Sequence, residues 1–165
     1  MDNYDVIIVG GGPAGLFAAM ELSRTHGLRV LLLEKGKDID KRICLALEEG
    51  GTCPPCSPCH LVSGLGGAGA FSDGKLTLSS QVGGRLPEYL DAGELEGFIN
   101  YVDGVYRRFG ASGAMYGQGE KVEDIRRRAA LADLRLISVP IRHMGTECSR
   151  QILRDMRDFL SPLVE

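Results

Sequence analysis

The sequence predicts an α/β fold that opens with a parallel β-α-β unit. Three observations predict it: an apolar, β-branched run at residues 4–9, a Gly-x-Gly-x-x-Gly turn at residues 10–15, and a second apolar run at residues 29–34. Short, uninterrupted apolar runs are typical of strands buried on both faces of a parallel sheet. The helix-forming stretch 15–23 lies between them, so the elements follow one another in the order that a β-α-β unit requires.

Periodicity is lost between residues 37 and 87, where glycine, proline and cysteine dominate. A loop this long inside a compact domain is usually functional. Beyond it, spaced apolar residues predict helices at 94–109 and 121–132, and an apolar run predicts a strand at 134–139.

Thr146 is expected to cap a last helix, because a threonine oxygen can accept from the first free N–H groups. The buried face of this helix should consist of Ile152, Leu153, Met156, Phe159 and Leu160. The predicted organisation is a β-α-β unit at 1–36, a glycine- and cysteine-rich loop region at 37–87, and a mainly helical continuation with one strand at 88–165.

Composition narrows the class of protein. The chain has 165 residues, 44% hydrophobic and 25% charged, as in folded domains rather than disordered ones. A net charge of −3 gives no indication of nucleic acid or membrane as a partner, so we expect a small-molecule substrate and leave the oligomeric state open. The acidic start differs from a secretory signal, and the five cysteines are an odd number, so we expect a cytoplasmic protein with reduced thiols.

The 23 glycines call for a local explanation, and the first cluster has one. Gly10 permits a tight turn, Gly12 lets a pyrophosphate approach the backbone, and Gly15 lets the helix pack closely on the strand. The free N–H groups of the first helical turn then face the phosphates. Glu34 ends the second strand, where its carboxylate can accept hydrogen bonds from the ribose hydroxyls and would repel the 2′-phosphate of NADP. The pattern predicts a dinucleotide site.

Two stretches carry a family resemblance. GGGPAGLFAAMEL followed by VLLLEKG looks like the amino-terminal signature of the FAD-containing flavoproteins built like glutathione reductase. The run GLGGAGAFSDGKL at 64–76 resembles a narrower family, the uncharacterised FAD-dependent dehydrogenases of bacteria and archaea, and RHMGT at 142–146 is similar to a further segment of that family.

The resemblance implies a Rossmann-like FAD/NAD(P)-binding fold with a doubly wound parallel sheet, incomplete in this chain, so we expect the N-terminal part of a longer FAD-dependent oxidoreductase. It implies hydride or electron transfer between an unknown substrate and FAD, with NAD(P)H open as an electron partner. By this resemblance the FAD-binding residues are Gly10, Gly12, Pro13, Ala14, Gly15, Glu34, Lys35, Arg42, Gly66 and Gly67. Arg42 is expected to reach the phosphates, and Gly66 and Gly67 to approach the flavin or its ribityl chain.

The second glycine cluster, at 64–74, suggests backbone lying close to a ligand. We hypothesise that Ser72, Asp73 and Lys75 lie near the flavin, with Lys75 and Asp73 as catalytic candidates. The alternative is a glycine-rich turn in which Lys75 is solvated and Asp73 caps the turn.

The motif CPPCSPC places Cys53, Cys56 and Cys59 at intervals of three residues. Three thiols so spaced can converge on zinc or an iron–sulfur cluster, although such sites usually have a fourth ligand. A redox-active dithiol and a stiff proline-rich loop are the other two interpretations. Two functions therefore compete with the flavoenzyme: a non-catalytic dinucleotide-binding module and a CxxCxxC metal-binding protein.

Overall fold

The computed structural model describes residues 3–165 and divides them into two compact units. The first unit holds the residues up to Gly74 together with those from Thr146 onward, and the second runs from Lys75 to Gly145. Among the helices of residues 3–165, none has the length and apolar character that crossing a bilayer requires.

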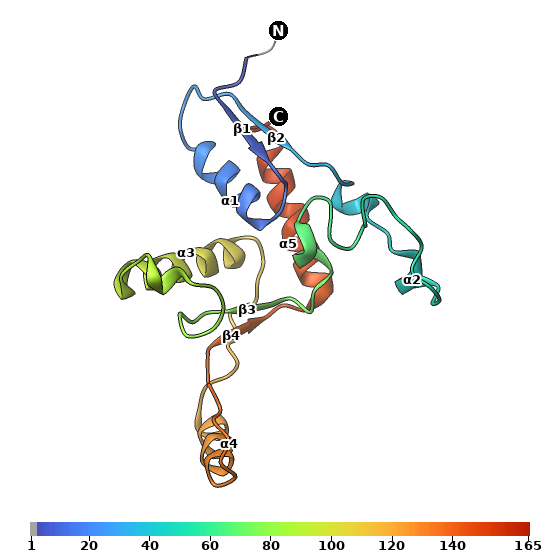
Figure 1. The fold of residues 1–165 in the computed structure, drawn as a ribbon. Helices are drawn as coiled ribbons and strands as arrows, with labels where there is room; N and C mark the ends of the chain where they lie inside the picture. The colour runs from blue at the N-terminus through green and yellow to red at the C-terminus, as the bar shows by residue number, and fades with distance from the viewer. Residues whose placement is uncertain (1–2) are drawn as a thin grey trace. The chain divides into compact units, whose positions relative to one another are not determined.

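The first unit contains the predicted parallel β-α-β arrangement (Figure 1). Strand β1 spans Val6–Val9, helix α1 spans Pro13–Leu22 and strand β2 spans Val30–Leu33. The two strands pair in parallel with Val6 opposite Val30. The amide of Gly10 extends the ladder by donating to the Leu33 carbonyl at 2.7 Å. The predicted strand, turn, helix and strand are confirmed, with bounds that differ by one or two residues.

The backbone of Glu165 pairs with the other edge of β2. Its N–H donates to the carbonyl of Val30 at 3.0 Å, and its carbonyl accepts from the N–H of Leu32 at 2.7 Å. One residue bonded to both neighbours of a single partner is the pattern of a parallel ladder. Helix α5, at Gly145–Leu160, leads into this segment, so β2 has a parallel neighbour on each side.

The core of the first unit lies on one face of the sheet. Leu16 of α1, Leu32 of β2 and Leu160 of α5 border the same small cavity of about 210 Å³, so both helices lie against this face. The buried side chains there are Leu16, Ala19, Met20, Val30, Ile152, Leu153, Met156 and Leu160. The predicted buried face of the last helix is thus confirmed except at Phe159, which is half-buried.

The opposite face of the β1–β2 sheet is apolar and exposed. Ile7 is 55% exposed, Val9 83% and Leu33 48%. Ile7 and Val9 alternate along β1 with inward-facing neighbours, as the period of two in a strand requires. The expectation of burial on both faces is therefore not met within residues 3–165.

Short helices interrupt the long loop. Two 3₁₀ helices span Ile39–Lys41 and Gly67–Phe71, and the single-turn helix α2 spans Leu45–Glu48. The sequence does not predict them, because each is shorter than two turns and so produces no apolar period.

The second unit combines a short antiparallel pair with two longer helices. Strand β3 at Lys75–Thr77 pairs with β4 at Ile141–His143, helix α3 spans Ala92–Arg108 and helix α4 spans Glu120–Ala130. A 3₁₀ turn at Leu86–Glu88 precedes α3. The predicted helices are confirmed, and α3 begins two residues early because the carboxylate of Asp91 caps it, accepting from Gly93 at 2.8 Å and Glu94 at 2.9 Å.

The strand predicted at 134–139 is wrong. Residues 134–140 form no strand, and Leu134 and Ile137 are 65% and 50% exposed. The chain becomes a strand only at Ile141, where β3 supplies a pairing partner. Burial of Arg142, whose Nη2 donates to the Asp103 carboxylate at 2.7 Å, fixes β4 in the unit. Apolar content is a weak guide to a strand where no neighbour supplies hydrogen bonds.

Candidate functional site

A cavity of about 470 Å³ lies in the first unit, where β1 and β2 end. Ligands of open α/β sheets bind beyond the carboxyl ends of parallel strands, which is the position of this cavity. Four segments supply its walls, namely the ends of β1 and β2, the first glycine turn and the loop at 62–67. The lining residues are Val9, Gly10, Gly12, Leu33, Glu34, Lys35, Val62, Ser63, Gly64 and Gly67.

The first glycine turn connects β1 directly to α1. Gly12 is the residue before the helix and Pro13 occupies its first position, where a missing N–H costs no helical hydrogen bond. A Cβ built on Gly15 would overlap the carbonyl oxygen of Gly10, so only glycine lets α1 begin so close to the strand. The first turn of the helix, which includes Ala14, therefore presents its N–H groups at the end of β1.

Glu34 lies at the centre of the site. One of its carboxylate oxygens, Oε1, accepts from the amides of Gly36 at 2.8 Å and Gly64 at 3.0 Å. The other, Oε2, accepts from the amide of Gly11 at 2.7 Å. One carboxylate thus joins the first glycine turn, the end of β2 and the second glycine loop. A carboxylate offers about four acceptor positions, so this arrangement leaves about one for a ligand hydroxyl.

The three amides also determine the charge of Glu34. Partial burial opposes ionisation, but the hydrogen bonds from Gly11, Gly36 and Gly64, with the nearby charge of Arg42, outweigh it and lower the pKa below the ordinary 4.5. Glu34 is therefore a carboxylate at neutral pH, as an acceptor of ribose hydroxyls has to be.

Arg42 organises the second glycine loop from inside. Its side chain is fully buried, and its guanidinium lies over the ring of Phe71 at 4.8 Å. Its N–H groups donate to backbone carbonyls between residues 60 and 67: His60 at 2.9 Å, Leu61 at 2.7 Å, Leu65 at 2.7 Å and Gly67 at 2.8 Å. Contact of Arg42 with a phosphate stays a prediction.

The second glycine loop packs directly on the first. The amide of Gly66 donates to the carbonyl of Gly11 at 2.8 Å. A Cβ on Gly36, just after β2, would overlap the backbone of Gly64, so the two backbones are in direct contact there. The second glycine loop, which the family resemblance places near the flavin, therefore forms one wall of the cavity beside the first glycine turn.

The structure brings several predicted site residues together. The cavity is lined by five of them: Gly10, Gly12, Glu34, Lys35 and Gly67. The adjoining first turn of α1 contains three more: Pro13, Ala14 and Gly15. Gly66 is buried behind the wall, where a Cβ would collide with Leu153 of α5. Their contacts with cofactor stay predictions.

Sequence reasoning missed Val62 and Ser63 as wall residues, and the amides of Gly36 and Gly64 as partners of Glu34. The sequence contains an indication for Gly64, because this residue belongs to the glycine-rich run that is expected to lie near a ligand. No sequence pattern indicated that Val62 and Ser63 would line the cavity.

The catalytic candidates lie in different units. Asp73 belongs to the first unit and Lys75 begins β3 of the second, and both side chains are exposed. Their proposed roles beside the flavin stay predictions.

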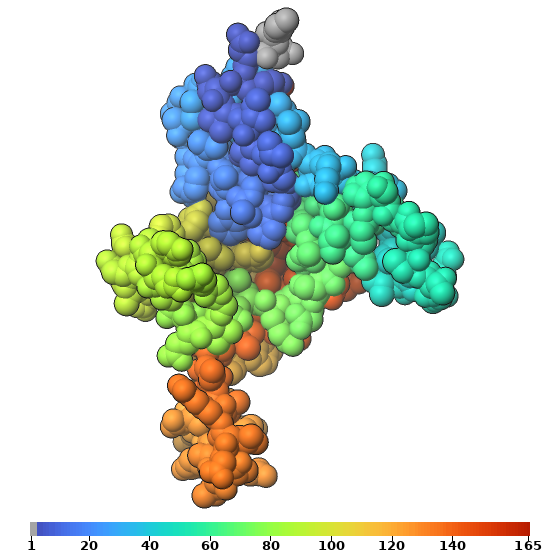
Figure 2. Space-filling view, in the orientation of Figure 1, coloured from blue at the N-terminus to red at the C-terminus, as the bar shows by residue number. Residues whose placement is uncertain are grey.

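The cysteine motif lies at the surface of the first unit, in the turquoise segment of Figure 2. Cys53 and Cys56 are exposed, Cys59 is half-buried, and all three are free thiols. Across residues 3–165 the structure brings no three cysteine, histidine or acidic side chains together as a ligand set for a metal. The prediction of a metal or iron–sulfur site gains no support from this arrangement.

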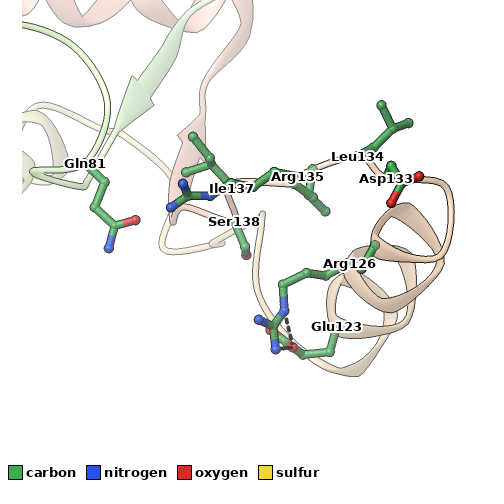
Figure 3. A pocket seen from close by; sticks show the side chains of 10 residues that line it. Gln81, Glu123, Arg126, Asp133, Leu134, Arg135, Ile137 and Ser138 are labelled. Carbon is green, nitrogen blue, oxygen red and sulfur yellow. Dashed lines mark hydrogen bonds and ion pairs between the residues drawn. The ribbon is translucent and has the colours of Figure 1, made fainter.

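The second unit has a larger hollow of about 770 Å³ between α4 and residues 133–138 (Figure 3). On the α4 wall, Arg126 pairs with Glu123 one turn away on the same helix, with Nη2 and Oε2 2.6 Å apart. Exposed Leu134 and Ile137 lie along the opposite wall. Its lining contains neither a glycine turn nor a strand end. Despite its larger volume, it is therefore a weaker candidate for a dinucleotide site than the cavity beside Glu34.

The chemistry of the smaller cavity fits a dinucleotide. A helix start beside backbone glycines suits a pyrophosphate, and an ionised carboxylate one strand away suits a ribose. Gly12 has open space around a built Cβ except for Gly67 at 3.9 Å, so its missing side chain leaves room on the cavity side. These residues fit an adenosine diphosphate group, which all adenine dinucleotides contain.

Comparison with known proteins agrees with this fit. Residues 5–64 match the family described as FAD binding domain. An uncharacterised protein of Clostridium beijerinckii is 44% identical over 71 residues, which are 43% of this chain and 13% of that protein. A provisionally named FAD-dependent oxidoreductase of Marinomonas mediterranea is 51% identical over 43 residues, 26% of this chain and 12% of that protein. Rifampicin monooxygenase of Streptomyces venezuelae is 69% identical over 32 residues, 19% of this chain and 6% of that protein.

The chain thus spans a small part of the relatives that it matches, and each match is local. The family match covers the glycine turn, both strands, Glu34 and Arg42. Residues 5–64 therefore resemble an FAD-binding domain, and FAD is the cofactor that this match indicates.

Proposed function

We propose that the cavity at the ends of β1 and β2 holds the adenosine diphosphate half of FAD, as part of an oxidoreductase that transfers hydride or electrons between a small-molecule substrate and the flavin. We also propose that its sheet is the Rossmann-like, doubly wound sheet that the sequence predicts. The observation that most strongly supports this proposal is the ionised Glu34 beside the glycine turn. Its carboxylate accepts hydrogen bonds from three amides that belong to three segments.

Each wall has a distinct part in binding. The first turn of α1 would face the pyrophosphate, Glu34 would accept from the ribose, and the loop at 62–67 would exclude water from one side. Bound FAD supplies the redox chemistry, and the protein supplies orientation and electrostatics. Lys35, exposed at the cavity edge, adds a positive charge on the approach side.

Gly12→Ala tests the proposal without disturbing the fold. The backbone of Gly12 is extended, at φ −75° and ψ −177°, which alanine adopts freely, and the added methyl group would meet only Gly67 at an ordinary 3.9 Å. The free energy of unfolding should change by less than about 0.5 kcal/mol. The dissociation constants of FAD and ADP should rise about tenfold or more, because the methyl group occupies the approach of the pyrophosphate.

Gly97→Ala is the matched control. Gly97 lies exposed in α3 of the second unit with open space around it, so the same added methyl group should leave FAD affinity unchanged. Unaltered affinity in Gly12→Ala, with the wild type binding FAD, would place the cofactor elsewhere.

A further inference from the structure

Three arginines form a stripe along α5 of the first unit. Arg150, Arg154 and Arg157 are spaced by four and three residues, which places them on one helix face. Arg154 Nε donates to Asp40 at 2.6 Å, and Arg157 Nη1 donates to Asp38 at 2.6 Å and Asp40 at 2.8 Å. The two later arginines therefore meet carboxylates.

Arg150 meets an aromatic ring in place of a carboxylate. Its guanidinium carbon lies 5.0 Å from the centre of the Phe71 ring. Its Nε is buried and has no hydrogen-bond partner among residues 3–165. A cation–π contact attracts the charge but leaves the N–H group unbonded, and a buried donor without an acceptor is destabilising. The side chain is thus held over the ring while its Nε–H donor stays unbonded.

The surroundings of Arg150 carry surplus positive charge. Arg42 lies over the same Phe71 ring at 4.8 Å, so two guanidinium groups share one aromatic side chain. The carbonyls that bind Arg42 are neutral and do not cancel its charge. Glu34 is the carboxylate that acts on Arg42 electrostatically, while the charge of Arg150 opposes that of Arg42 and lowers its pKa after the larger effect of burial.

The backbone around this cluster is fixed. Leu153, one turn after Arg150, packs where a Cβ of Gly66 would be, and Thr146 Oγ1 donates to the carbonyl of Ser72 at 2.8 Å. Helix α5 is therefore attached to the second glycine loop on both sides of Arg150. The backbone on either side of Arg150 is thus held in place before any anion binds.

We propose that Arg150, held over Phe71 beside the buried Arg42, is a binding site for an oxyanion, either a phosphate group or a carboxylate. A guanidinium presents a planar fork of donors that matches two oxygens of such groups. A neutral ligand would satisfy the donor but bring no negative charge to the guanidinium groups of Arg150 and Arg42. The proposal goes beyond FAD binding by the first glycine turn and stands whether or not that binding is found.

Inorganic phosphate is the probe, titrated at constant ionic strength into the chain labelled with ¹⁵N at arginine. Loss of one Nε–H resonance in Arg150→Met assigns Arg150, and methionine preserves apolar contact with Phe71. The Arg150 resonance should shift saturably with phosphate. Phosphate should also raise the unfolding temperature, and phosphate affinity should fall about tenfold or more in Arg150→Met. Arg154→Met, one turn along the helix, should keep the wild-type affinity.

Repeating the titration with FAD present distinguishes the source of the oxyanion. If FAD prevents the phosphate-dependent shift, the site takes a phosphate of the cofactor; if the shift persists, it takes a separate anion such as a substrate carboxylate. A chain that fails to bind FAD but retains the Arg150 response would contradict the proposed function and leave this site standing. An Arg150 resonance that phosphate never moves, or equal phosphate affinity in wild type and Arg150→Met, would overturn the proposal.

Discussion

The amide of Gly64 donates to the carboxylate of Glu34 at 3.0 Å, joining residues thirty positions apart. The same carboxylate accepts from Gly11 and Gly36, so the residue expected to bind ribose also holds the cavity walls together. Binding and local stability are therefore coupled at Glu34.

Glu34→Gln should weaken both properties. A glutamine amide cannot accept at its nitrogen, so at least one of the three backbone amides loses its acceptor, which destabilises a fold by about 1–3 kcal/mol. FAD affinity should fall about tenfold or more. Urea unfolding and a fluorescence titration of FAD measure the two effects, with exposed Glu48→Gln as the control. A variant as stable as the wild type would contradict the three-amide geometry.

The acid stability of the protein should depend on Glu34. Its pKa in the folded state is below 4.5, so its stabilising contribution is complete above that pH and is lost as the pH falls through the folded value. The wild type should therefore lose more free energy of unfolding on acidification than Glu34→Gln does. Urea titrations at a series of pH values give the free energy of unfolding of both proteins as a function of pH. An identical pH dependence would show that the hydrogen bonds to Glu34 do not lower its pKa.

Gly15→Ala should destabilise the first unit strongly. The added methyl group overlaps the Gly10 carbonyl oxygen, which belongs to backbone and cannot rotate away. We expect a loss of about 1–3 kcal/mol or more. Gly97→Ala should instead raise stability by up to about 1 kcal/mol, because alanine is the better helix former at an exposed position. Denaturant unfolding of the two variants should give changes of opposite sign.

Arg42→Met should disorder the second glycine loop. It removes the donors that hold the carbonyls of residues 60–67, and we expect a cost of about 3 kcal/mol or more. Limited proteolysis should then cut within 60–67. Arg24→Met removes an exposed pair with Glu21 and should change stability by less than about 0.5 kcal/mol. A loop as resistant as in the wild type would mean that Arg42 does not organise it.

Nucleotide discrimination should follow the charge of Glu34. Adenosine 2′,5′-bisphosphate places a phosphate where the carboxylate accepts the ribose hydroxyl, so it should bind more weakly than ADP, by about tenfold. Glu34→Gln should reduce this difference. Competition of both nucleotides against FAD measures it, and equal binding of both to the wild type would place the ribose away from Glu34.

The sequence was sufficient for the parts that depend on neighbouring residues. The turn at Gly10, the helix after Gly12 and the strand ending at Glu34 follow from local spacing and apolar runs, and the structure confirms them. The capping box of α3 extends the predicted helix without changing its nature.

The parts that depend on distant partners could not be predicted in this way. Gly36 and Gly64 meet Glu34 only after the intervening loop has folded, and Arg42 finds its carbonyl acceptors about twenty residues away. The strand at Ile141 forms because β3 lies beside it, although 134–139 is the more apolar run. The structure at Glu34, Arg42 and Ile141 thus depends on partners that are distant in the sequence more than on local composition.

Amide chemical-shift mapping of the ¹⁵N-labelled chain with ADP tests the central claim most directly. We expect saturable shifts at residues 10–15, 34–36 and 62–67, which surround the cavity at the ends of β1 and β2, and unchanged amides at 120–138. Saturable shifts confined to the hollow between α4 and residues 133–138, with none at Gly12 or Gly64, would contradict it.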